Sequence, residues 1–431
     1  MMALGLVAMG GAFVLTLTTG NPALADAQWS NGNLTAEFPA APVNCAATSG
    51  PQRPDCRVAD RLADKQDPGR VADMIDVRRL GARGDGQADD TGALQAAFDQ
   101  AGRDGRAVWL PPGDYVYSGQ LKINGARVRG AGAGSRLMAA EPTQQRILMT
   151  GAAPHLACLQ ILYHDLERKG SDHGRKGVMV QDATDFLVHD VFFNGQGYGK
   201  APKFGGGALF IYRSSSGRVL NNRFDYTAAD SIHITGGSTD ILVQGNHIEY
   251  SGDDGIAVVN YGNAVRNNVL ILDNTVLNNR WGRNISAVGG QDIRILNNRI
   301  RGNLSDGAGV YIASEKAYKT AGPERILVQD NTIEDTGGPG KRHGQIMLWT
   351  GNDNPVGDVV VRNNTIRDSK QKDLAIVVSN KVNNVVLDSN RTDGKTTLRG
   401  DASILEIGNG GGSGSGAKPT PTAMGSQASC G

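Results

Sequence analysis

The sequence predicts an all-β fold, a β-solenoid in which short parallel strands stack coil upon coil. From Val219 onward, an apolar-x-x-Asn-x-apolar unit recurs as VLNNRF, VQGNHI, ILDNTV, ILNNRI, VQDNTI, VRNNTI and LDSNRT. Intervals from the twenties to the low thirties are typical of one solenoid coil per repeat. The composition agrees, because 59 glycines and an aromatic content of only 5% favour many short strands around small aliphatic side chains. We therefore expect one repeat domain, although 431 residues could hold two or three ordinary ones.

The repeating asparagine is predicted to face into the coil. Its positions are Asn222, Asn246, Asn274, Asn298, Asn331, Asn364 and Asn390. An inward Asn can bond its neighbours above and below, which forms a ladder that satisfies buried backbone groups. Because one coil cannot bury its apolar face alone, stability is a sum of neighbour contacts, and the ends of the solenoid need caps.

The first 25 residues are apolar, and Ala23-Leu24-Ala25 ahead of Asp26 fits a small-residue cleavage site. We interpret residues 1–25 as a signal peptide, which predicts a secreted or periplasmic protein with no stable membrane insertion after cleavage. An uncleaved anchor is the alternative, since no Lys or Arg precedes Arg53 and the usual positive start is missing. No later run is long and apolar enough to span a bilayer.

The four cysteines suit an exported protein with one or two disulfides. Residues 26–70 are predicted to be an N-terminal extension in which Cys45 and Cys56 form a staple. Cys158, in the apolar run LACLQIL, is predicted to be a buried small hydrophobe. Residues 408–431, which include Cys430, are rich in Gly, Ser and Pro and are predicted to be a flexible tail. No Cys/His spacing indicates zinc.

The segment 75–119 predicts a helix followed by a strand. Asp90 or Thr91 can cap a helix over Thr91 to Gly102, and Ala107 to Leu110 is a strand stopped by Pro111-Pro112. The apolar face of the helix would be Leu94, Ala97, Phe98 and Ala101. We expect this helix to cover the open N-terminal end of a solenoid that spans residues 71–407.

The same segment resembles the pectate-lyase-like superfamily, whose members often open with GAxGDGxxDDTxAlqxA and then vylPpGxY. The corresponding residues are Gly81 to Gly86, Asp89-Asp90-Thr91 and Leu110 to Tyr115. The resemblance implies a single-stranded right-handed parallel β-helix with a short N-terminal capping helix, and it says almost nothing about the reaction. We assign Asp85, Asp89 and Asp90 to capping and turns.

Three aspartates on two consecutive repeats are the candidate catalytic residues. Asp230 lies in AADSIHI, and Asp253 and Asp254 lie in SGDDGIAV. Stacked coils would bring the three carboxylates into one groove, where one gives a proton to a leaving oxygen and another activates water. Adjacent strand residues point to opposite faces, so the pair must sit at a bend, which Gly252 and Gly255 would permit. A calcium site and plain turn carboxylates are the alternatives.

These repeats also resemble polygalacturonases (glycoside hydrolase family 28), which carry N-T-D-G-I-D, G-D-D-C-I-A, G-H-G-I-S and R-I-K on successive coils. The resemblance makes Asp253 the general acid, with Asp254 and Asp230 positioning water for an inverting hydrolysis. In the third motif, Trp281-Gly282-Arg283-Asn284-Ile285-Ser286, Arg283 replaces the histidine. In the fourth, Tyr311 and Ala313 stand where the substrate-gripping Arg and Lys would be. Ordinary pectin hydrolysis is therefore not expected, and the sugar stays open.

Five further residues are candidate substrate contacts. Arg283 is a planar donor that can clamp an acidic sugar or a hydroxyl pair, unless it pairs with a groove aspartate. Tyr311 and Glu315 can hold a sugar or decorate the surface, His233 can face the groove or be structural, and Trp349 can stack on a sugar or plug the core.

The predicted function is an exported carbohydrate-active enzyme that hydrolyses a polysaccharide without a cofactor. One alternative is a lyase or C5-epimerase on a uronate polymer, for which Arg283, His233 or Tyr311 would serve as base or clamp and Ca²⁺ could take part. Another is a non-catalytic carbohydrate-binding protein or adhesin, although an acidic pair that occurs once argues against decoration. The net charge of +1 gives no argument for nucleic acid as a partner.

Overall fold

The computed structural model describes residues 74–141, 145–162, 177–195, 207–262, 265–371, 374–379 and 381–400, and the backbone of strands at 29–30, 33–34, 404–407 and 410–411. The predicted signal peptide, Cys45, Cys56 and Cys430 lie outside the described residues. The chain divides into two units, 1–46 and 47–431. In the first, β1 (Trp29–Ser30) pairs antiparallel with β2 (Asn33–Leu34). No described helix is long and apolar enough to cross a membrane.

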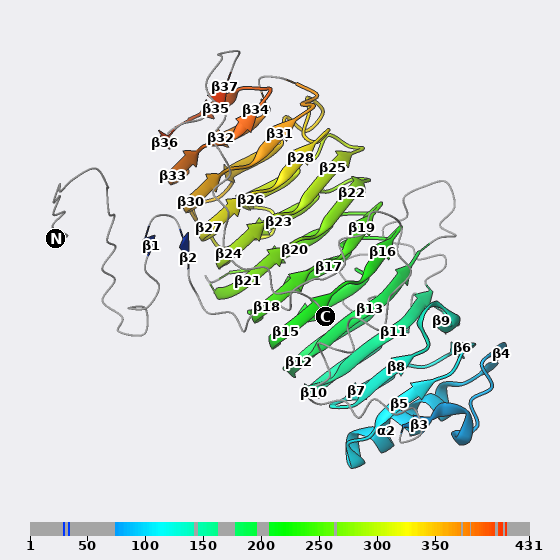
Figure 1. The fold of residues 1–431 in the computed structure, drawn as a ribbon. Coiled ribbons are helices and arrows are strands. Elements are labelled where there is room, and N and C mark those ends of the chain that lie inside the picture. The colour runs from blue at the N-terminus through cyan, green and yellow to red at the C-terminus, as the bar shows by residue number, and fades with distance from the viewer. Residues whose placement is uncertain are drawn as a thin grey trace, which may run out of the picture. The chain divides into compact units, whose positions relative to one another are not determined.

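The second unit is a parallel β-helix, in which each coil contributes strands to three rows (Figure 1). The first row contains β7 (Leu121–Asn124), β10 (Ile147–Ala152), β12 (Val178–Thr184), β14 (Leu209–Tyr212), β17 (Ile232–Thr235), β20 (Ile256–Val259), β23 (Ile285–Val288), β26 (Val310–Ser314), β29 (Ile346–Thr350), β32 (Ile376–Ser379) and β35 (Thr396–Arg399). We call it row A.

The second row, row B, contains β3 (Ile75–Asp76), β5 (Ala107–Leu110), β8 (Arg127–Gly130), β15 (Ser215–Leu220), β18 (Thr239–Gln244), β21 (Arg266–Leu272), β24 (Gln291–Leu296), β27 (Glu324–Gln329), β30 (Gly357–Arg362), β33 (Asn383–Asp388) and β36 (Ile404–Ile407). The third row, row C, contains β4 (Asp85–Asp89), β6 (Gly113–Tyr117), β9 (Ser135–Ala139), β16 (Arg223–Asp225), β19 (His247–Glu249), β22 (Thr275–Asn279), β25 (Arg299–Asn303), β28 (Thr332–Glu334), β31 (Thr365–Arg367), β34 (Arg391–Thr392) and β37 (Gly410–Gly411). Two long strands, β11 (His155–Leu162) and β13 (Leu187–Asn194), belong to both row B and row C.

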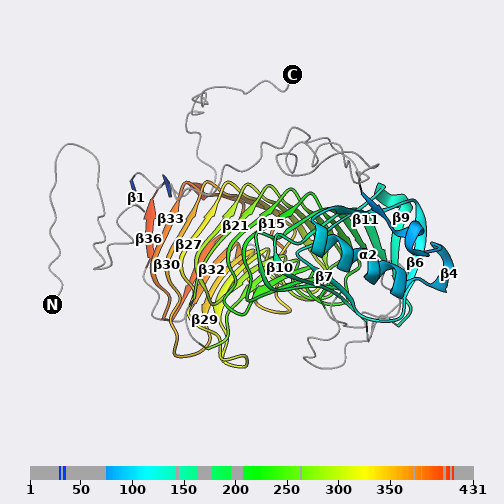
Figure 2. The same cartoon turned by 90° about the horizontal axis from the view of Figure 1, so that it is seen from below.

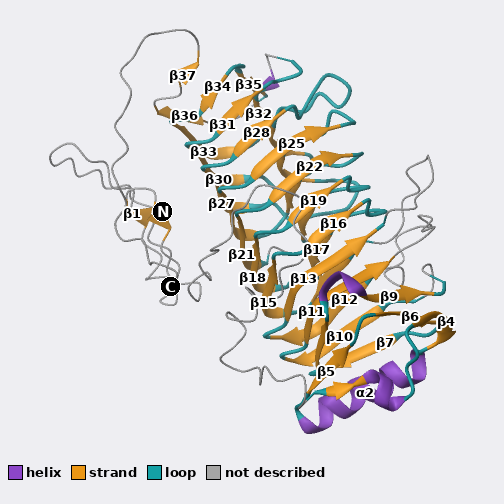
Figure 3. Ribbon diagram, turned by 45° about the vertical axis from the view of Figure 1, so that its right-hand side comes forward, coloured by secondary structure: helices purple, strands orange, loops and turns teal. Residues whose placement is uncertain are grey.

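The helix α2 (Thr91–Asp104) lies at the N-terminal end of the coils, beside β5 and β7 (Figure 2). It buries the predicted apolar face and ends at Gly105, whose φ of 76° is the left-handed conformation that glycine adopts without strain. Figure 3 shows it as the long helix of the structure, against a body of strands. Two 3₁₀ turns lie at Val77–Leu80 and Gly132–Gly134.

Asp90 is the N-cap residue of this helix, as predicted, but its side chain makes no capping hydrogen bond. The carboxylate of Asp90 accepts hydrogen bonds from the main-chain N–H groups of Arg83 and Gly84, at 2.7 and 3.0 Å, and none from the helix. The preceding loop folds back against this carboxylate, so its amides reach it in place of the helix N–H groups. Asp89 accepts from the N–H of Thr91 and so supports the turn role assigned to these acids.

The inward side chains form continuous aliphatic columns. In row A the register pairs Ile232 with Ile256, Ile256 with Ile285, and Ile285 with Val310, and each of these side chains is fully buried. Such stacking buries the apolar face of every coil against its neighbours. Cys158 is also buried, as predicted.

The asparagine ladder runs unbroken along one corner of the coil. Asn274 is typical: its main-chain N–H and its Nδ2 both donate to Oδ1 of Asn298, at 2.9 and 3.0 Å, and the same pattern links each ladder residue from Asn222 to Asn390. The residue before each ladder asparagine has φ between 51° and 68°; these residues are Asn221, Gly245, Asp273, Asn297, Asp330, Asn363 and Ser389. Asn, Asp and Gly tolerate this conformation best, which explains why the repeats read NN, GN and DN.

Candidate active site

The candidate site lies where the chain enters consecutive strands of row A. Because Ile232, Ile256 and Ile285 are in register, the residues two positions before them stack in one column. That column is Asp230, Asp254 and Arg283. Asp253 precedes Asp254 at a bend, as the prediction required.

The three aspartates form one cluster in the tertiary structure. A carboxylate oxygen of each lies within 4.8 Å of the others. Asp230 Oδ1 accepts a hydrogen bond from the main-chain N–H of Asp254, at 2.8 Å. Asp254 is 5% exposed, whereas Asp230 and Asp253 are partly exposed. The carboxylate of Asp230 therefore binds the main chain of Asp254. Of the adjacent residues Asp253 and Asp254, Asp253 is the more accessible.

Gly252 and Gly255 are required for a different reason from the one predicted. Neither has a positive φ, so the bend does not depend on glycine's freedom there. A Cβ on Gly252 would lie 2.5 Å from the carbonyl oxygen of Ala228, and one on Gly255 the same distance from that of Asn284. A Cβ on Gly282 would lie 2.4 Å from Oδ1 of Asp254. Glycine thus lets neighbouring coils, and the carboxylates on them, approach closely.

Arg283 is enclosed by protein partners. Its Nε lies 3.4 Å from Oδ1 of Asp254, and its Nη2 donates to Oε1 of Glu315 at 3.2 Å. Its guanidinium stacks over the ring of Tyr311, 4.2 Å from the ring centre. The side chain is 16% exposed, and the two carboxylates outweigh burial and raise its pKa. The guanidinium is therefore a permanent cation that holds the site together.

Tyr311 and Glu315 do not form an open sugar platform. Tyr311 is 2% exposed, because Arg283 covers its ring and the His343 ring stacks against it with centroids 5.3 Å apart. Its hydroxyl donates to Glu315 Oε1 at 3.1 Å. Burial raises the pKa of the Tyr311 hydroxyl, so it stays protonated. Tyr311 and Glu315 were predicted to hold a sugar or to decorate the surface; in the structure both contact Arg283.

His233 contacts the cluster through Asp230. Its Nδ1 is 2.5 Å from Oδ2 of Asp230, and its ring stacks on Phe210 with centroids 4.7 Å apart. The side chain is buried, and Nε2 has no hydrogen-bond partner. This geometry suits a residue that orients the carboxylate of Asp230.

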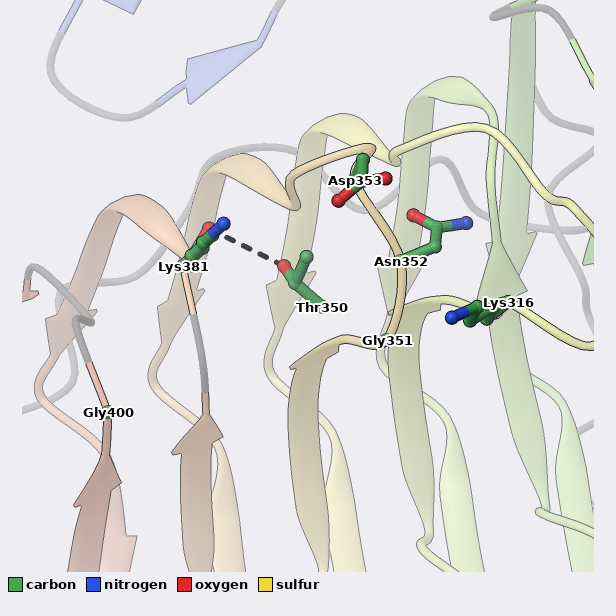
Figure 4. Close-up of a pocket in the computed structure, with 7 residues that line it drawn as sticks. All are labelled: Lys316, Thr350, Gly351, Asn352, Asp353, Lys381 and Gly400. Carbon is green, nitrogen blue, oxygen red and sulfur yellow. Dashed lines mark hydrogen bonds between the residues drawn. The ribbon is translucent and has the colours of Figure 1, made fainter.

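Trp349 is not part of this cluster. It lies on β29, three strands along row A from β20, which corresponds to about 14 Å at the usual spacing of parallel strands. It is half-buried and packs against an outer apolar cluster that includes Ala313 and Met347. A pocket beyond the end of β29 is lined by Lys316, Thr350, Gly351, Asn352, Asp353, Lys381 and Gly400, and contains none of the three aspartates (Figure 4).

Several residues around the cluster were not among the site residues predicted from the sequence. The Oγ of Ser286 donates to Oδ2 of Asp254 at 2.5 Å. Trp281 and Tyr261 are exposed on loops beside it. Lys341 arrives from a distant loop, where its Nζ contacts the carbonyl oxygen of Trp281 and lies 4.8 Å from the centre of its indole ring. Trp281 and Ser286 both stand in the third motif but were not chosen as site residues; Tyr261 and Lys341 are brought in by loops whose path the repeat does not encode.

The surroundings of Asp254 oppose its ionisation. Burial raises the pKa of Asp254, and the negative charge of Asp230 adds to this, while Arg283 opposes it. Burial and the charge of Arg283 lower the pKa of Lys341, and they lower that of His343 to about 4. His343 is therefore neutral at physiological pH, and its Nδ1 accepts a hydrogen bond from the N–H of Ala308 at 3.3 Å.

Two groups of described residues have metal-ligand chemistry within 4.8 Å. One is the aspartate cluster, whose carboxylates suit a hard cation such as Ca²⁺. The other is Cys158, His189 and Asp190, on β11 and β13. Cys158 lies one coil away from the adjacent His189 and Asp190, so no local Cys/His spacing could reveal the group.

Comparison with known proteins agrees with the fold. Residues 74–153 match the family described as rhamnogalacturonase A/epimerase, pectate lyase-like, and residues 207–410 match the right-handed β-helix region family. The chain belongs to the pectate-lyase-like superfamily of right-handed parallel β-helices. The first match ends before the aspartates, so it bears on the fold at the N-terminal end and not on the reaction.

Individual relatives share the fold. A probable rhamnogalacturonase A of Aspergillus oryzae is 27% identical over 125 residues, which are 27% of this chain and 26% of that protein. The chain thus matches about a quarter of the length of this superfamily member. The catalytic unit of a GH87 α-1,3-glucanase from Streptomyces thermodiastaticus has a TM-score of 0.58 at 19% identity, over 80% of this chain and 70% of that one. The A-module of a mannuronan C-5 epimerase from Azotobacter vinelandii has a TM-score of 0.51 at 18% identity, over 79% and 100%.

Proposed function

We propose that this protein is a polysaccharide hydrolase that uses Asp253 as general acid and Asp254 and Asp230 to hold and deprotonate water. The convergence of three carboxylates within 4.8 Å on two coils carries the proposal. Asp253 gives its proton to the leaving glycosidic oxygen as the C–O bond breaks. The water oxygen bonds to the anomeric carbon, and its proton passes to the Asp254–Asp230 pair. The raised pKa of Asp254 suits a group that must accept a proton.

Hydrogen bonding at the cluster favours water activation over a covalent intermediate. The two oxygens of Asp254 accept from the main-chain N–H of Arg283 and from Ser286, and those of Asp230 are held by Asp254 and His233. A carboxylate with both oxygens engaged is a poor nucleophile but can still orient water. The carboxylates are closer than the ~6.5–9.5 Å typical of inverting pairs. We nevertheless propose inversion, because two of the three carboxylates can hold one water molecule between them.

The relatives support a polysaccharide as the substrate class. They include proteins named as rhamnogalacturonase, α-1,3-glucanase and mannuronan epimerase. Elimination or epimerisation on a uronate is the second candidate, but it needs a free base and a cationic clamp. Arg283 is already paired with Asp254 and Glu315, and Tyr311 is buried with a raised pKa, so neither fits those roles in the described geometry.

Purified protein incubated with a panel of neutral and acidic polysaccharides tests the proposal. Hydrolysis releases reducing ends without ultraviolet absorbance from an unsaturated product, whereas elimination produces both. Proton NMR of the first product then reports the anomeric configuration, for which inversion is expected. Unsaturated products, or reducing ends released equally by Asp253→Asn, would overturn the assignment.

A further inference from the structure

We propose that Cys158, His189 and Asp190 form a structural zinc site that joins two neighbouring coils at the corner between row B and row C. Cys158 lies on β11, and the other two residues lie on the adjacent strand β13 (Figure 1). The thiol sulfur, a ring nitrogen and a carboxylate oxygen of these residues lie within 4.8 Å of one another. All three residues are buried. The site is separate from the aspartate cluster and does not depend on the proposed hydrolysis.

The proposed site occupies the corner at which the asparagine ladder stops. Leu159 pairs in register with Val191, so Cys158 stands opposite Asp190 at the corner. The main-chain N–H of Val191 donates to Oδ1 of Asn222 at 3.0 Å, as the N–H of each ladder asparagine does to the next one. Val191 and Leu159 thus stand where the ladder would continue, but their side chains have no amide. The corner between these two coils therefore lacks the side-chain link that joins the later coils.

Two buried imidazoles at this corner each have a nitrogen without a hydrogen-bond partner. The Nδ1 of His189 lies 2.8 Å from Oδ2 of Asp190, but its Nε2 has no partner, although the residue is only 1% exposed. His155, which is 8% exposed, stacks against His189 with ring centroids 4.7 Å apart, and its Nε2 also has no partner. Burial lowers the pKa of His155, so its ring is neutral. Neutral imidazole is the form in which histidine binds a metal.

The donor set favours Zn²⁺ over the hard cations. Zinc is bound by cysteine thiolate, histidine nitrogen and carboxylate oxygen, whereas Ca²⁺ and Mg²⁺ take oxygen ligands. His155 is the candidate for the fourth position of the closed tetrahedral site that is typical of structural zinc. When the ion binds, a bond forms between zinc and the sulfur of Cys158, and the thiol proton passes to solvent.

Metal content and cobalt spectroscopy of the full chain test the site. Protein refolded with Zn²⁺ and then dialysed should retain about one zinc ion at this site per chain. Replacement of zinc by Co²⁺ should produce a thiolate-to-metal charge-transfer band, which requires a bound cysteine. Zn²⁺ should also raise the midpoint of thermal unfolding by at least about 3 °C relative to protein treated with EDTA, because the ion binds the folded chain.

Three variants assign these signals to the corner. Cys158→Ala should lose the charge-transfer band and the zinc-dependent shift of the midpoint. His189→Gln, which keeps the thiol, should bind zinc at least about 10-fold more weakly. Asp254→Asn alters the aspartate cluster, which contains no thiol, and is the control that should keep both the band and the shift.

Several results would overturn the proposal. One is parent protein that retains no zinc and gives no cobalt–thiolate band after refolding with the metal. Another is a band that persists in Cys158→Ala. If Cys158→Ala does not fold, His189→Gln decides the question, because an unchanged zinc affinity in that variant also rules out the site.

Discussion

The main-chain N–H of Asp254 donates a hydrogen bond to Oδ1 of Asp230, 2.8 Å away on the preceding coil. The carboxylate on one coil therefore fixes the backbone that carries the adjacent acidic pair on the next. The charged carboxylate of Asp230 thus helps to set the position of Asp254, because one coil contributes the carboxylate and the next coil contributes the N–H group that it binds.

Replacing Asp253 with asparagine should remove nearly all turnover and leave the fold intact. Asparagine keeps the shape of the side chain but cannot supply the proton that the leaving oxygen needs, and such steps contribute about 10²- to 10⁴-fold. Steady-state kinetics on the identified polysaccharide, with circular dichroism of the variant, measures both effects.

Asp254→Asn and Asp230→Asn should also lower kcat, with a combined loss that is less than additive, because the pair acts on one water. Asp99→Asn, on the exposed face of α2, is the control and should keep full activity. Wild-type activity in all three cluster variants would show that the catalytic site lies elsewhere. Loss of stability together with loss of a bound calcium ion would instead favour the metal site.

Replacing Arg283 with alanine should affect the stability of the fold more than the affinity for substrate. The change strips a buried guanidinium from Asp254 and Glu315, and breaking a buried pair costs about 3–5 kcal/mol. The sequence alone left open whether Arg283 clamps a sugar or pairs with an aspartate of the cluster, and the structure shows it paired with Asp254 and Glu315. Chemical denaturation gives the change in the free energy of unfolding.

Arg213→Ala serves as the matched control for Arg283. Arg213 pairs with Asp182 at 2.7 Å, but both side chains are about half exposed, so solvent screens the pair and the loss of stability should be small. If the two arginine variants lose the same stability, Arg283 does not hold the site together.

Asn298→Ala should destabilise the solenoid by about 3 kcal/mol or more. The substitution leaves the N–H of Asn274 and the carbonyl of Ile271 without their side-chain partner in a buried corner, and each unsatisfied group costs roughly 1–3 kcal/mol. Asn383→Ala, at an exposed position of β33, should change stability by less than about 0.5 kcal/mol. Comparable unfolding midpoints for the two variants would contradict a structural role for the ladder.

His343 should make stability depend on pH between about 4 and 6.5. Its pKa in the folded protein is about 4, below the ordinary 6.5, so the unfolded chain binds more protons in this window. Stability should therefore be fully present above pH 6.5 and fall as the pH drops, by at most about 3 kcal/mol from this residue. The difference between the pH profiles of thermal unfolding of the parent protein and of His343→Gln isolates the effect. Parallel profiles would mean that His343 titrates normally in the folded state.

The candidate site was only partly predictable. The register of the repeat was enough to bring Asp230 and Asp254 together, because equivalent positions of parallel coils must stack. The enclosure of Tyr311 was not predictable, since it depends on His343, which a loop brings back from 32 residues away. Lys341 arrives by the same loop and was missed for the same reason.

The sequence by itself determined the coils, the inward asparagines and the capping helix, because these follow from local periodicity and from contacts repeated at a fixed interval. Only the tertiary structure decided what Arg283 does and why Gly252 and Gly255 are glycines. Both answers depend on distances between atoms of different coils: 3.4 Å from Arg283 to Asp254, and 2.5 Å from a hypothetical Cβ to the carbonyl oxygen of a neighbouring coil. Periodicity sets which residues are neighbours along the stack, but the loops and the turn geometry between strands set how closely they approach.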